Sequence, residues 1–541
     1  TIMMNIYIFN NASRAASYGI GTYAKQLAKV LMPLSCVNVS IVDLQADAME
    51  FSINHDENGF CHYIIPQLES NIESETYCRC TFYFLARNIE TDKNNRLIFL
   101  FNYFQHYPLA VLLKAWQPHS IIILSVHYMS WCFELMGNVR RMREIVNCSN
   151  DNPTEQEKRV LSSFAKERLF LHLSDTVISL SRKTKDILIK DYHVTENKIR
   201  LIYNGLGEVP HDSIHSPKQD CRTILFVGRL DKEKGLSYLI DAFASIANKY
   251  PNTNLQVVGD GDFQPYLVQS RKLAGRIIFF GKTEKDEIEA LYQSADIGVM
   301  PSFHEQCSYT AIEMMRHGIP VIGTSSTGLS EMLDATPDLR MEINEMQFDE
   351  DDFKAQIASR LELLLSDSVA YEHASNAIRK QYEERYTITK MSRNMSSMFL
   401  DSCKLTSVIS EDFLPHLDDR MVEIINMQPD IDLDFYGAGG IGVYLWWRVL
   451  QLGKMNFKDD DQLALIKEHL IYYVDWIDEI AKCQPLPPEL HTTLIDMGKH
   501  SFYPTKVRPI LEHHGVISPN DILHDEITIL ENALKICTCK I

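Results

Sequence analysis

The sequence predicts an α/β protein built from two parallel-sheet domains. Short apolar runs, such as those at 97–102 and 121–126, are typical of buried strands, and helical patterns separate them. The same alternation starts again at residue 223, after a segment (207–222) that contains two prolines and has no apolar period. Glycines follow several runs, which suits a turn from strand to helix.

Composition limits the possible classes of protein. A chain of 541 residues with 45% hydrophobic residues has room for two to four globular domains, and its net charge of −19 argues against nucleic acid as a partner. No apolar run is long enough to span a membrane, and the chain enters a strand almost at once, so we expect neither a membrane segment nor a signal peptide. The 12 cysteines are scattered without zinc spacing, so we expect reduced thiols, no metal site and a cytoplasmic protein.

The first half contains a glycine turn. A strand at 4–9 and a polar loop precede Gly19 and Gly21, which open a helix that runs to about residue 31. Two glycines let the backbone approach a ligand closely, although many such glycines serve only the turn. Ala24 stands in place of a third glycine, so the turn is not a full dinucleotide fingerprint.

Further strands are expected at 37–42, 176–180 and 199–203, and a long helix is expected at 154–172. Residues 56–80 are poorly patterned and suggest an irregular insertion.

His127 ends the strand at 121–126, at the edge where cleft residues gather. A lone histidine is more often structural, and the position at a strand end leaves a functional role open. Ser181 also follows a strand, where a helix N-cap is at least as good an interpretation.

The second half begins with a strand at 223–227, followed by Gly228 and a cationic loop. Arg229 and Lys234 lie five residues apart between glycines, so together they can hold a diphosphate and neutralise charge on a leaving group. The alternative is a pair of surface cations. Gly259 and Gly261 form another close-approach turn after the strand at 255–258.

Residues 297–323 predict a strand (297–300), a loop, a helix from 309 to 317 and a further strand from 319. The N–H groups of Cys307, Ser308 and Tyr309 would open the helix toward an anion. Glu305 could hold sugar hydroxyls and Glu313 a ribose diol, because a carboxylate among apolar neighbours needs hydrogen-bond donors. The alternative for Glu313 is a solvated carboxylate on an amphipathic helix.

These motifs together resemble the signature of retaining glycosyltransferases of family four, which have the GT-B fold. The resemblance covers roughly residues 3–400 and rests on Arg229, Lys234 and the spacing from Glu305 to Glu313, followed by Gly-Ile-Pro-Val. It implies two Rossmann-like parallel-sheet domains facing a cleft, plus a C-terminal α-helical extension. The expected parts are an acceptor-side domain (1–206), a nucleotide-sugar-binding domain (207–385), a return helix (386–403) and the extension (404–541), which is either structural or a docking module for acceptor or partner.

The resemblance implies that a sugar moves, with retention, from a nucleotide-diphosphate sugar to an acceptor. A UDP-sugar is the expected donor, with no metal or other cofactor, and the acceptor is a glycan, a lipid-linked sugar or a peptide. It puts His127 beside the donor sugar, the turn of Gly19 and Gly21 near the phosphates and acceptor, and the backbone near Lys282 at the nucleobase. The departing phosphate helps to deprotonate the acceptor.

The chain departs from the family pattern at three places. Gln306 stands where glycine is common, Cys307-Ser308 replaces Phe-Gly, and Met314 replaces alanine. Residues 10–23 and 305–308 resemble a subgroup met in Bacteroidetes, some of which modify ribosomal peptides.

The main alternative to a glycosyltransferase is a catalytically weak scaffold or partner-binding protein. A nicotinamide enzyme lacks the third glycine, and a glycoside phosphorylase lacks its lysine pattern. The oligomeric state is not predicted.

Overall fold

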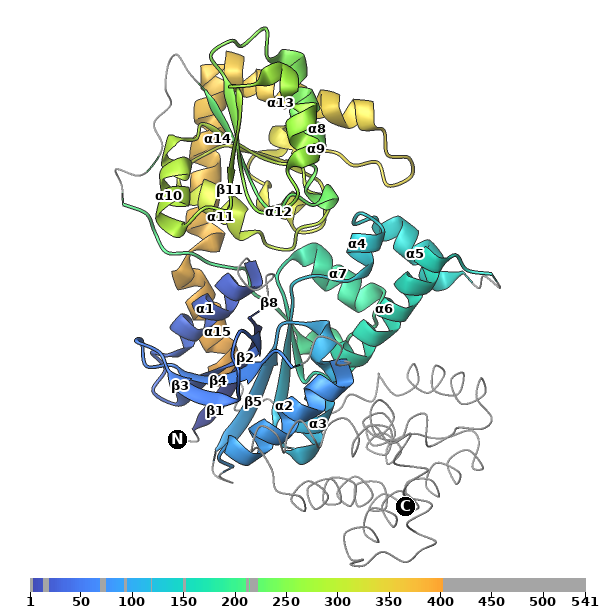
Figure 1. Cartoon of the computed structure of the whole chain (residues 1–541), viewed down its shortest axis with the longest axis vertical. Coiled ribbons are helices and arrows are strands. Elements are labelled where there is room, and N and C mark those ends of the chain that lie inside the picture. Colours follow the sequence, from blue (N-terminus) through green and yellow to red (C-terminus); the bar gives the residue numbers. More distant parts are fainter. Residues whose placement is uncertain are drawn as a thin grey trace, which may run out of the picture.

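The computed structural model of the chain describes residues 3–12, 19–68, 74–91, 95–117, 119–148, 152–210, 214 and 222–401. They form two α/β domains, drawn one above the other in Figure 1, and the last described helix runs from the upper domain back to the lower one. The predicted extension at 404–541 lies outside the described residues. No helix in the described part combines the length and hydropathy needed to cross a membrane.

The N-terminal domain is one eight-stranded sheet in the order β3-β4-β2-β1-β5-β6-β7-β8. All neighbouring strands are parallel except β3, which pairs antiparallel with β4. The strands are β1 (Met4–Asn11), β2 (Val37–Ala46), β3 (Ser52–His55), β4 (Cys61–Pro66), β5 (Arg96–Phe101), β6 (Ile121–Val126), β7 (Thr176–Ser179) and β8 (Ile199–Leu201). The helices are α1 (Gly19–Leu31), α2 (Ser74–Asn88), α3 (Tyr107–Trp116), α4 (Trp131–Glu134), α5 (Val139–Asn147), α6 (Glu155–Leu173) and α7 (Arg182–Lys190).

The C-terminal domain is a six-stranded parallel sheet in the order β11-β10-β9-β12-β13-β14. Its strands are β9 (Thr223–Val227), β10 (Asn254–Val258), β11 (Ile277–Gly281), β12 (Ile297–Met300), β13 (Val321–Thr324) and β14 (Arg340–Met341). Its helices are α8 (Leu236–Ile246), α9 (Gln264–Gln269), α10 (Lys285–Ser294), α11 (Tyr309–Arg316), α12 (Leu329–Met332), α13 (Glu350–Ser366) and α14 (Ser368–Gln381), and α15 (Ile388–Asp401) follows.

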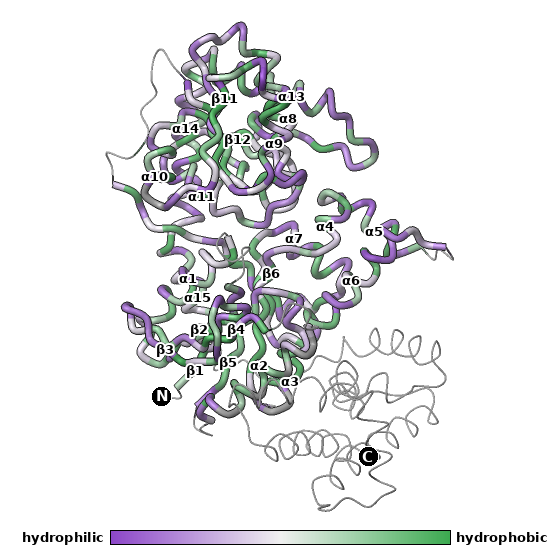
Figure 2. Tube along the Cα trace, in the orientation of Figure 1, coloured by the Kyte–Doolittle hydropathy of each residue, from purple (hydrophilic) through white to green (hydrophobic). Residues whose placement is uncertain are grey.

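The central strands are buried on both faces, as their apolar sequences predict. Every residue of β6 and of β12 is buried, and hydrophobic residues fill the interior of each domain in Figure 2. In the N-terminal sheet, side chains alternate between two cores because successive strand residues point to opposite faces. Phe9 and Phe99 belong to the core that contains α2, α3 and α6, whereas Ile8 and Ile98 belong to the core that contains α1 and α15.

The chain crosses between the two domains twice, and the two crossing segments lie side by side. The backbone N–H of Leu206 donates to the carbonyl of Tyr386 (3.0 Å), and the N–H of Ile388 donates back to the carbonyl of Leu206 (2.7 Å). The strand-like pairing brings the outgoing and returning segments of the chain side by side. Beyond it, α15 packs on α1 in the N-terminal domain.

The interpretation of residues 56–80 as an irregular insertion is wrong. This stretch contains β4 and the first half of α2. The strand was missed because it lies toward the edge of the sheet, where Cys61 and His62 are only partly buried and the apolar run is short.

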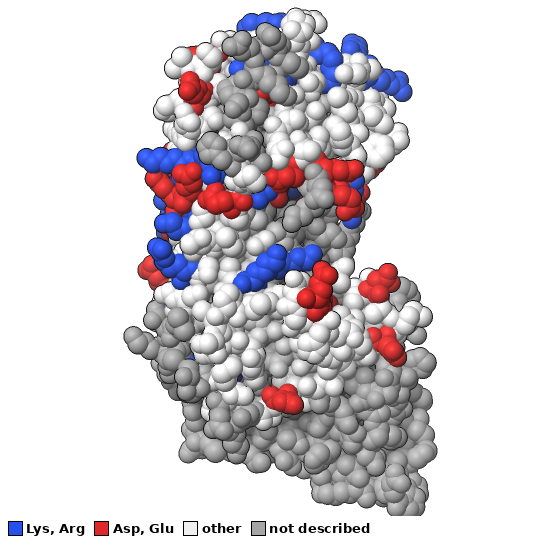
Figure 3. All heavy atoms as spheres, turned by 90° about the vertical axis from the view of Figure 1, so that its left-hand side faces the viewer, with Lys and Arg blue, Asp and Glu red and all other residues white. Residues whose placement is uncertain are grey.

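Charges are mixed on the surface. Figure 3 shows one face, where Asp and Glu side chains gather in a band across the lower part of the C-terminal domain, with Lys and Arg side chains above and below it.

Candidate active site

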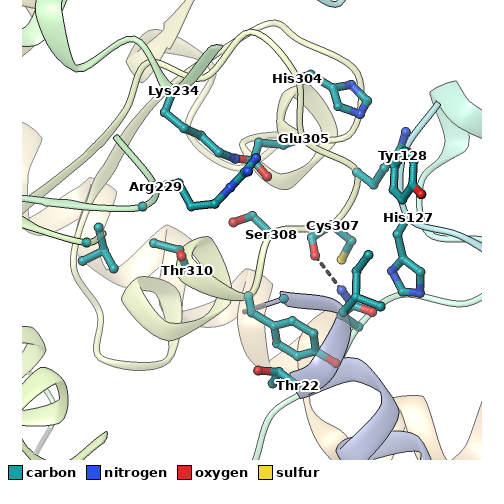
Figure 4. A pocket seen from close by; sticks show the side chains of 18 of the residues that line it. Thr22, His127, Tyr128, Arg229, Lys234, His304, Glu305, Cys307, Ser308 and Thr310 are labelled. Atoms are coloured by element: carbon teal, nitrogen blue, oxygen red, sulfur yellow. Dashed lines mark hydrogen bonds and ion pairs between the residues drawn. The ribbon is translucent and has the colours of Figure 1, made fainter. Parts of the chain in front are cut away.

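One cavity of about 710 Å³ lies between the two domains, at the carboxyl ends of their parallel strands. Ligands of open parallel sheets bind at this edge. Most of the predicted site residues line this cavity, namely Gly19, His127, Gly228, Arg229, Gly259, Lys282, Glu305, Cys307, Ser308, Tyr309, Glu313 and Lys234. Figure 4 shows His127 on the opposite side of the cavity from Arg229 and Lys234.

Two predicted glycines do not line the cavity. Gly21 is a buried residue of α1 and does not line the cavity, although its neighbours Gly19, Ile20 and Thr22 do. Gly261 packs against Leu230: an added Cβ would lie 2.8 Å from the Leu230 Cβ. Gly261 therefore has a packing role in this structure.

The cationic loop after β9 is held in place by close backbone contacts. An added Cβ on Gly259 would lie 1.7 Å from the carbonyl oxygen of Gly228, and its φ of +148° also requires glycine. The Arg229 guanidinium forms ion pairs with Asp231 (2.8 Å) and Glu233 (3.1 Å) and is 39% exposed. The Arg229 side chain is therefore accessible from the cavity, and two carboxylates hold it in place.

Lys234 and Glu305 meet inside the cavity. Lys234 Nζ lies 2.6 Å from Glu305 Oε1, and the two side chains are 18% and 13% exposed. Their loops are fixed to each other because the N–H of Phe303 donates to the carbonyl of Glu233 (2.8 Å). A cation and a carboxylate from chain positions 71 residues apart thus form one polar unit.

The start of α11 faces the same cavity. Ser308 is its N-cap and accepts a hydrogen bond from the N–H of Ala311 (3.4 Å), and Ser308, Tyr309 and Thr310 all line the cavity. The preceding Cys307 is buried, and burial raises the pKa of its thiol well above the ordinary value, so this sulfur is not an available thiolate. Its carbonyl accepts a hydrogen bond from the Asn204 amide of the other domain (2.6 Å).

The carboxylate of Glu313 is oriented by a buried tyrosine. Tyr292 donates its hydroxyl to Glu313 Oε2 at 2.6 Å, and burial together with the nearby carboxylate raises the pKa of Tyr292 well above its usual range. Tyr292 therefore stays protonated and keeps donating. The alternative interpretation of Glu313, a solvated carboxylate on an amphipathic helix, is wrong, since this carboxylate is partly buried, hydrogen-bonded to Tyr292 and part of the cavity wall.

The hydrogen bonds around His127 show which of its ring nitrogens carries the proton. The Asn102 amide donates to the carbonyl of Phe9 (2.9 Å), so its oxygen must be the atom that faces His127 Nε2 at 3.0 Å, and Nε2 carries the proton. Burial lowers the pKa of His127 to about 3. Its Nδ1 is therefore a hydrogen-bond acceptor at neutral pH.

The loop that carries Glu305 is also bound to the N-terminal domain. Ser181 is the N-cap of α7, as expected, and its hydroxyl also donates to Gln306 Oε1 (3.2 Å). Thr184 donates to the same oxygen. Next to them, the Arg182 guanidinium forms an ion pair with Glu331 (2.7 Å). The side chain of Gln306, at a position where glycine is common in the resembling family, thus connects the two domains beside the cavity.

Several residues that line the cavity were not predicted from the sequence. Tyr103, Tyr128, Phe133, Asn204 and His304 all line it. Tyr103, Tyr128 and Asn204 come within a few residues of a strand end, and that position was the one available signal. Phe133 and His304 lie on a short helix and a loop, where nothing in the sequence indicates the direction of a side chain. Among the described residues, no group of three or more His, Cys, Asp or Glu is arranged to hold a metal ion.

Comparison with known proteins matches both domains to glycosyltransferases. Residues 19–207 match the family model Glycosyltransferase Family 4, and residues 221–367 match the model Glycosyl transferases group 1. An uncharacterized glycosyltransferase of Methanocaldococcus jannaschii is 29% identical over 250 residues, 43% of this chain and 62% of that protein. A glycogen synthase of Mycobacterium tuberculosis is 30% identical over 173 residues, 31% of this chain and 41% of that enzyme. The chain thus spans less than two thirds of either relative.

Solved structures share the fold at low identity. Sucrose-phosphate synthase from Thermosynechococcus elongatus has a TM-score of 0.59 and 18% identity, over 74% of this chain and 100% of that one. HepE of Anabaena, in complex with UDP and glucose, has a TM-score of 0.51 and 14% identity, also over 74% and 100%. The chain therefore has the GT-B fold, and each of its two domains matches a glycosyltransferase family model.

Proposed function

We propose that this protein is a retaining glycosyltransferase that moves a sugar from a nucleotide-diphosphate sugar to an acceptor hydroxyl. The observation that carries the proposal is one cavity that brings together Arg229, Lys234, Glu305, Glu313 and His127 from two domains. The match of both domains to glycosyltransferase family models supports it.

The diphosphate of the donor binds between the cationic loop and the start of α11. Arg229 and Lys234 supply two positive charges, and the N–H groups at the amino end of α11 add the positive end of a helix dipole. These groups neutralise the negative charge that grows on the diphosphate as it departs. They supply the charge that a divalent cation supplies elsewhere, so we propose a metal-independent reaction with no further cofactor.

The nucleoside and the sugar bind on either side of the diphosphate. Glu313, oriented by Tyr292, accepts hydrogen bonds from the ribose diol. Glu305 accepts hydrogen bonds from hydroxyls of the donor sugar while Lys234 holds it in place. His127 reaches the same sugar from the other domain with its Nδ1 acceptor. UDP is the first nucleoside diphosphate to test, because a structural relative has been solved with UDP and glucose.

The acceptor oxygen forms a bond to the anomeric carbon of the sugar. The bond from that carbon to the diphosphate oxygen breaks, and its electron pair leaves with the diphosphate. The acceptor proton passes to the departing diphosphate, so the products are a glycoside and a nucleoside diphosphate. This route needs no side-chain nucleophile, which agrees with the buried, protonated thiol of Cys307. We place the reaction in the cytoplasm.

A donor assay tests the proposal. The full chain is incubated with labelled UDP-, GDP- and ADP-glucose without acceptor, release of sugar is measured, and thermal unfolding is followed with each nucleoside diphosphate. We expect slow hydrolysis of one donor and a higher unfolding temperature with the matching diphosphate. Hydrolysis of none, with no change in unfolding temperature, would instead favour a partner-binding scaffold.

A further inference from the structure

The charges of the cavity are divided unequally between its two walls. The charged side chains that line it are Arg229, Glu233, Lys234, Lys282, Glu305 and Glu313, all from the C-terminal domain. Among the described residues of the N-terminal domain, those that line it are uncharged. His127 is part of this second wall and is neutral at physiological pH. A molecule held against the N-terminal wall therefore meets no ion pair from the described residues.

The uncharged wall carries a row of aromatic rings. The rings of Tyr128 and Phe133 lie 5.7 Å apart, and those of Phe133 and His304 lie 6.2 Å apart in an edge-to-face arrangement. Behind them, Phe104 supports Tyr128 at 6.1 Å. Phe133 remains 46% exposed even though it lines a cavity between two domains. The row runs from the N-terminal domain to His304 of the C-terminal domain, with the half-exposed apolar ring of Phe133 in the middle.

His304 ends the row with an unused hydrogen-bond acceptor. Thr327 donates its only hydroxyl proton to the carbonyl of Glu305, so Thr327 Oγ1 accepts from His304 Nδ1 at 3.4 Å. The other ring nitrogen, Nε2, then carries a lone pair. It is buried without a hydrogen-bond partner among the described residues, and burial lowers the pKa of His304 to about 4. A buried acceptor of this kind is costly unless a ligand supplies the donor.

We propose that the acceptor of the reaction is an uncharged sugar ring, bound against Phe133 and Tyr128 with one hydroxyl donating to His304 Nε2. The proposal rests on the glycosyltransferase function and names its acceptor class. A sugar ring offers an apolar C–H face to an aromatic ring and hydroxyl groups at its rim, which matches a wall of aromatic rings with isolated polar groups. A phosphorylated or carboxylated acceptor would need a cation, and this wall supplies none from the described residues.

An acceptor panel tests the class. The full chain is given the three labelled nucleotide sugars with methyl glucoside, methyl galactoside and methyl mannoside, and in parallel with the corresponding hexose 6-phosphates. We expect transfer to at least one methyl glycoside, with kcat/KM at least ten-fold above that for its phosphorylated counterpart. Preference for the 6-phosphates, or hydrolysis of a donor with transfer only to a peptide or lipid, would overturn the acceptor class and leave the glycosyltransferase function standing. If no donor is bound or hydrolysed, both proposals fall.

Variants of Phe133 test the position. Phe133→Leu removes the aromatic face but keeps an apolar side chain, and we expect KM for the methyl glycoside to rise about three- to ten-fold, the effect of losing one aromatic contact. Phe133→Tyr restores the ring and should restore KM. Phe263→Leu is the matched control, since Phe263 is a similarly exposed phenylalanine that does not line the cavity. An unchanged KM in Phe133→Leu, or an equal rise in the control, would refute the placement.

Discussion

Replacement of Arg229 by alanine separates the stability of this protein from its proposed catalysis. The Arg229 guanidinium pairs with Asp231 at 2.8 Å and Glu233 at 3.1 Å, and it is 39% exposed. Ion pairs this exposed are screened by solvent and contribute at most about 1 kcal/mol, which lowers the unfolding temperature by only about 2–4 °C. Loss of one preorganised group that stabilises developing negative charge costs about 2.7–4 kcal/mol of transition-state free energy. We therefore expect kcat to fall by about 10²- to 10³-fold in a nearly intact fold.

The measurement is the initial rate of donor hydrolysis at saturating nucleotide sugar, together with thermal unfolding of the same preparation. Lys232→Ala is the control, because Lys232 is an exposed cation on the same loop that does not line the cavity. It should keep the rate of the unaltered chain. A rate for Arg229→Ala within about three-fold of that chain would refute a charge-stabilising role, because three-fold corresponds to only about 0.7 kcal/mol. An unfolding temperature lowered by more than about 10 °C would show that Arg229 stabilises the fold by more than two exposed ion pairs can.

Three further predictions concern other groups. Glu313→Ala should weaken UDP binding by about ten- to a hundred-fold in calorimetry, since it removes charge-assisted hydrogen bonds, and unchanged affinity would exclude Glu313 from the nucleotide site. Lys114→Met should destabilise the N-terminal domain by about 3–5 kcal/mol, because the buried Asp175 carboxylate loses a partner at 2.9 Å; in chemical denaturation, adding Asp175→Asn should recover part of the loss, and no recovery would contradict this reasoning. Burial raises the pKa of Glu167 from 4.5 to about 7, so the folded state binds more protons between these values and stability falls as pH rises from 4.5 to 7. Unfolding temperatures should therefore decline more steeply over that pH range in the unaltered chain than in Glu167→Gln, and parallel curves would show that Glu167 does not cause the decline.

Local sequence was enough to predict the strands of the core and the edge at which the site lies. The run Ile121–Val126 is apolar at nearly every position because a parallel strand is covered on both faces, so its assignment needed no information about neighbours. The carboxyl ends of such strands meet at one edge of a sheet, which indicates why Arg229 and Glu305 lie together and why His127 lies at the corresponding edge of the other sheet. Edge elements were less predictable: β4 is half-exposed and short, and its sequence carries only a weak period.

The sequence by itself determined which residues can bear charge near the strand ends, because strand, turn and helix signals are local and place Arg229 and Lys234 beside glycines and Glu313 within a helix. Only the tertiary structure decided which of these groups meet and in what chemical state. The 2.6 Å pair of Lys234 and Glu305, the neutral ring of His304 and the exposed ring of Phe133 depend on how two domains and a loop lie in space. Distances between distant segments and the desolvation of a side chain are properties of packing, and a linear pattern does not encode them residue by residue.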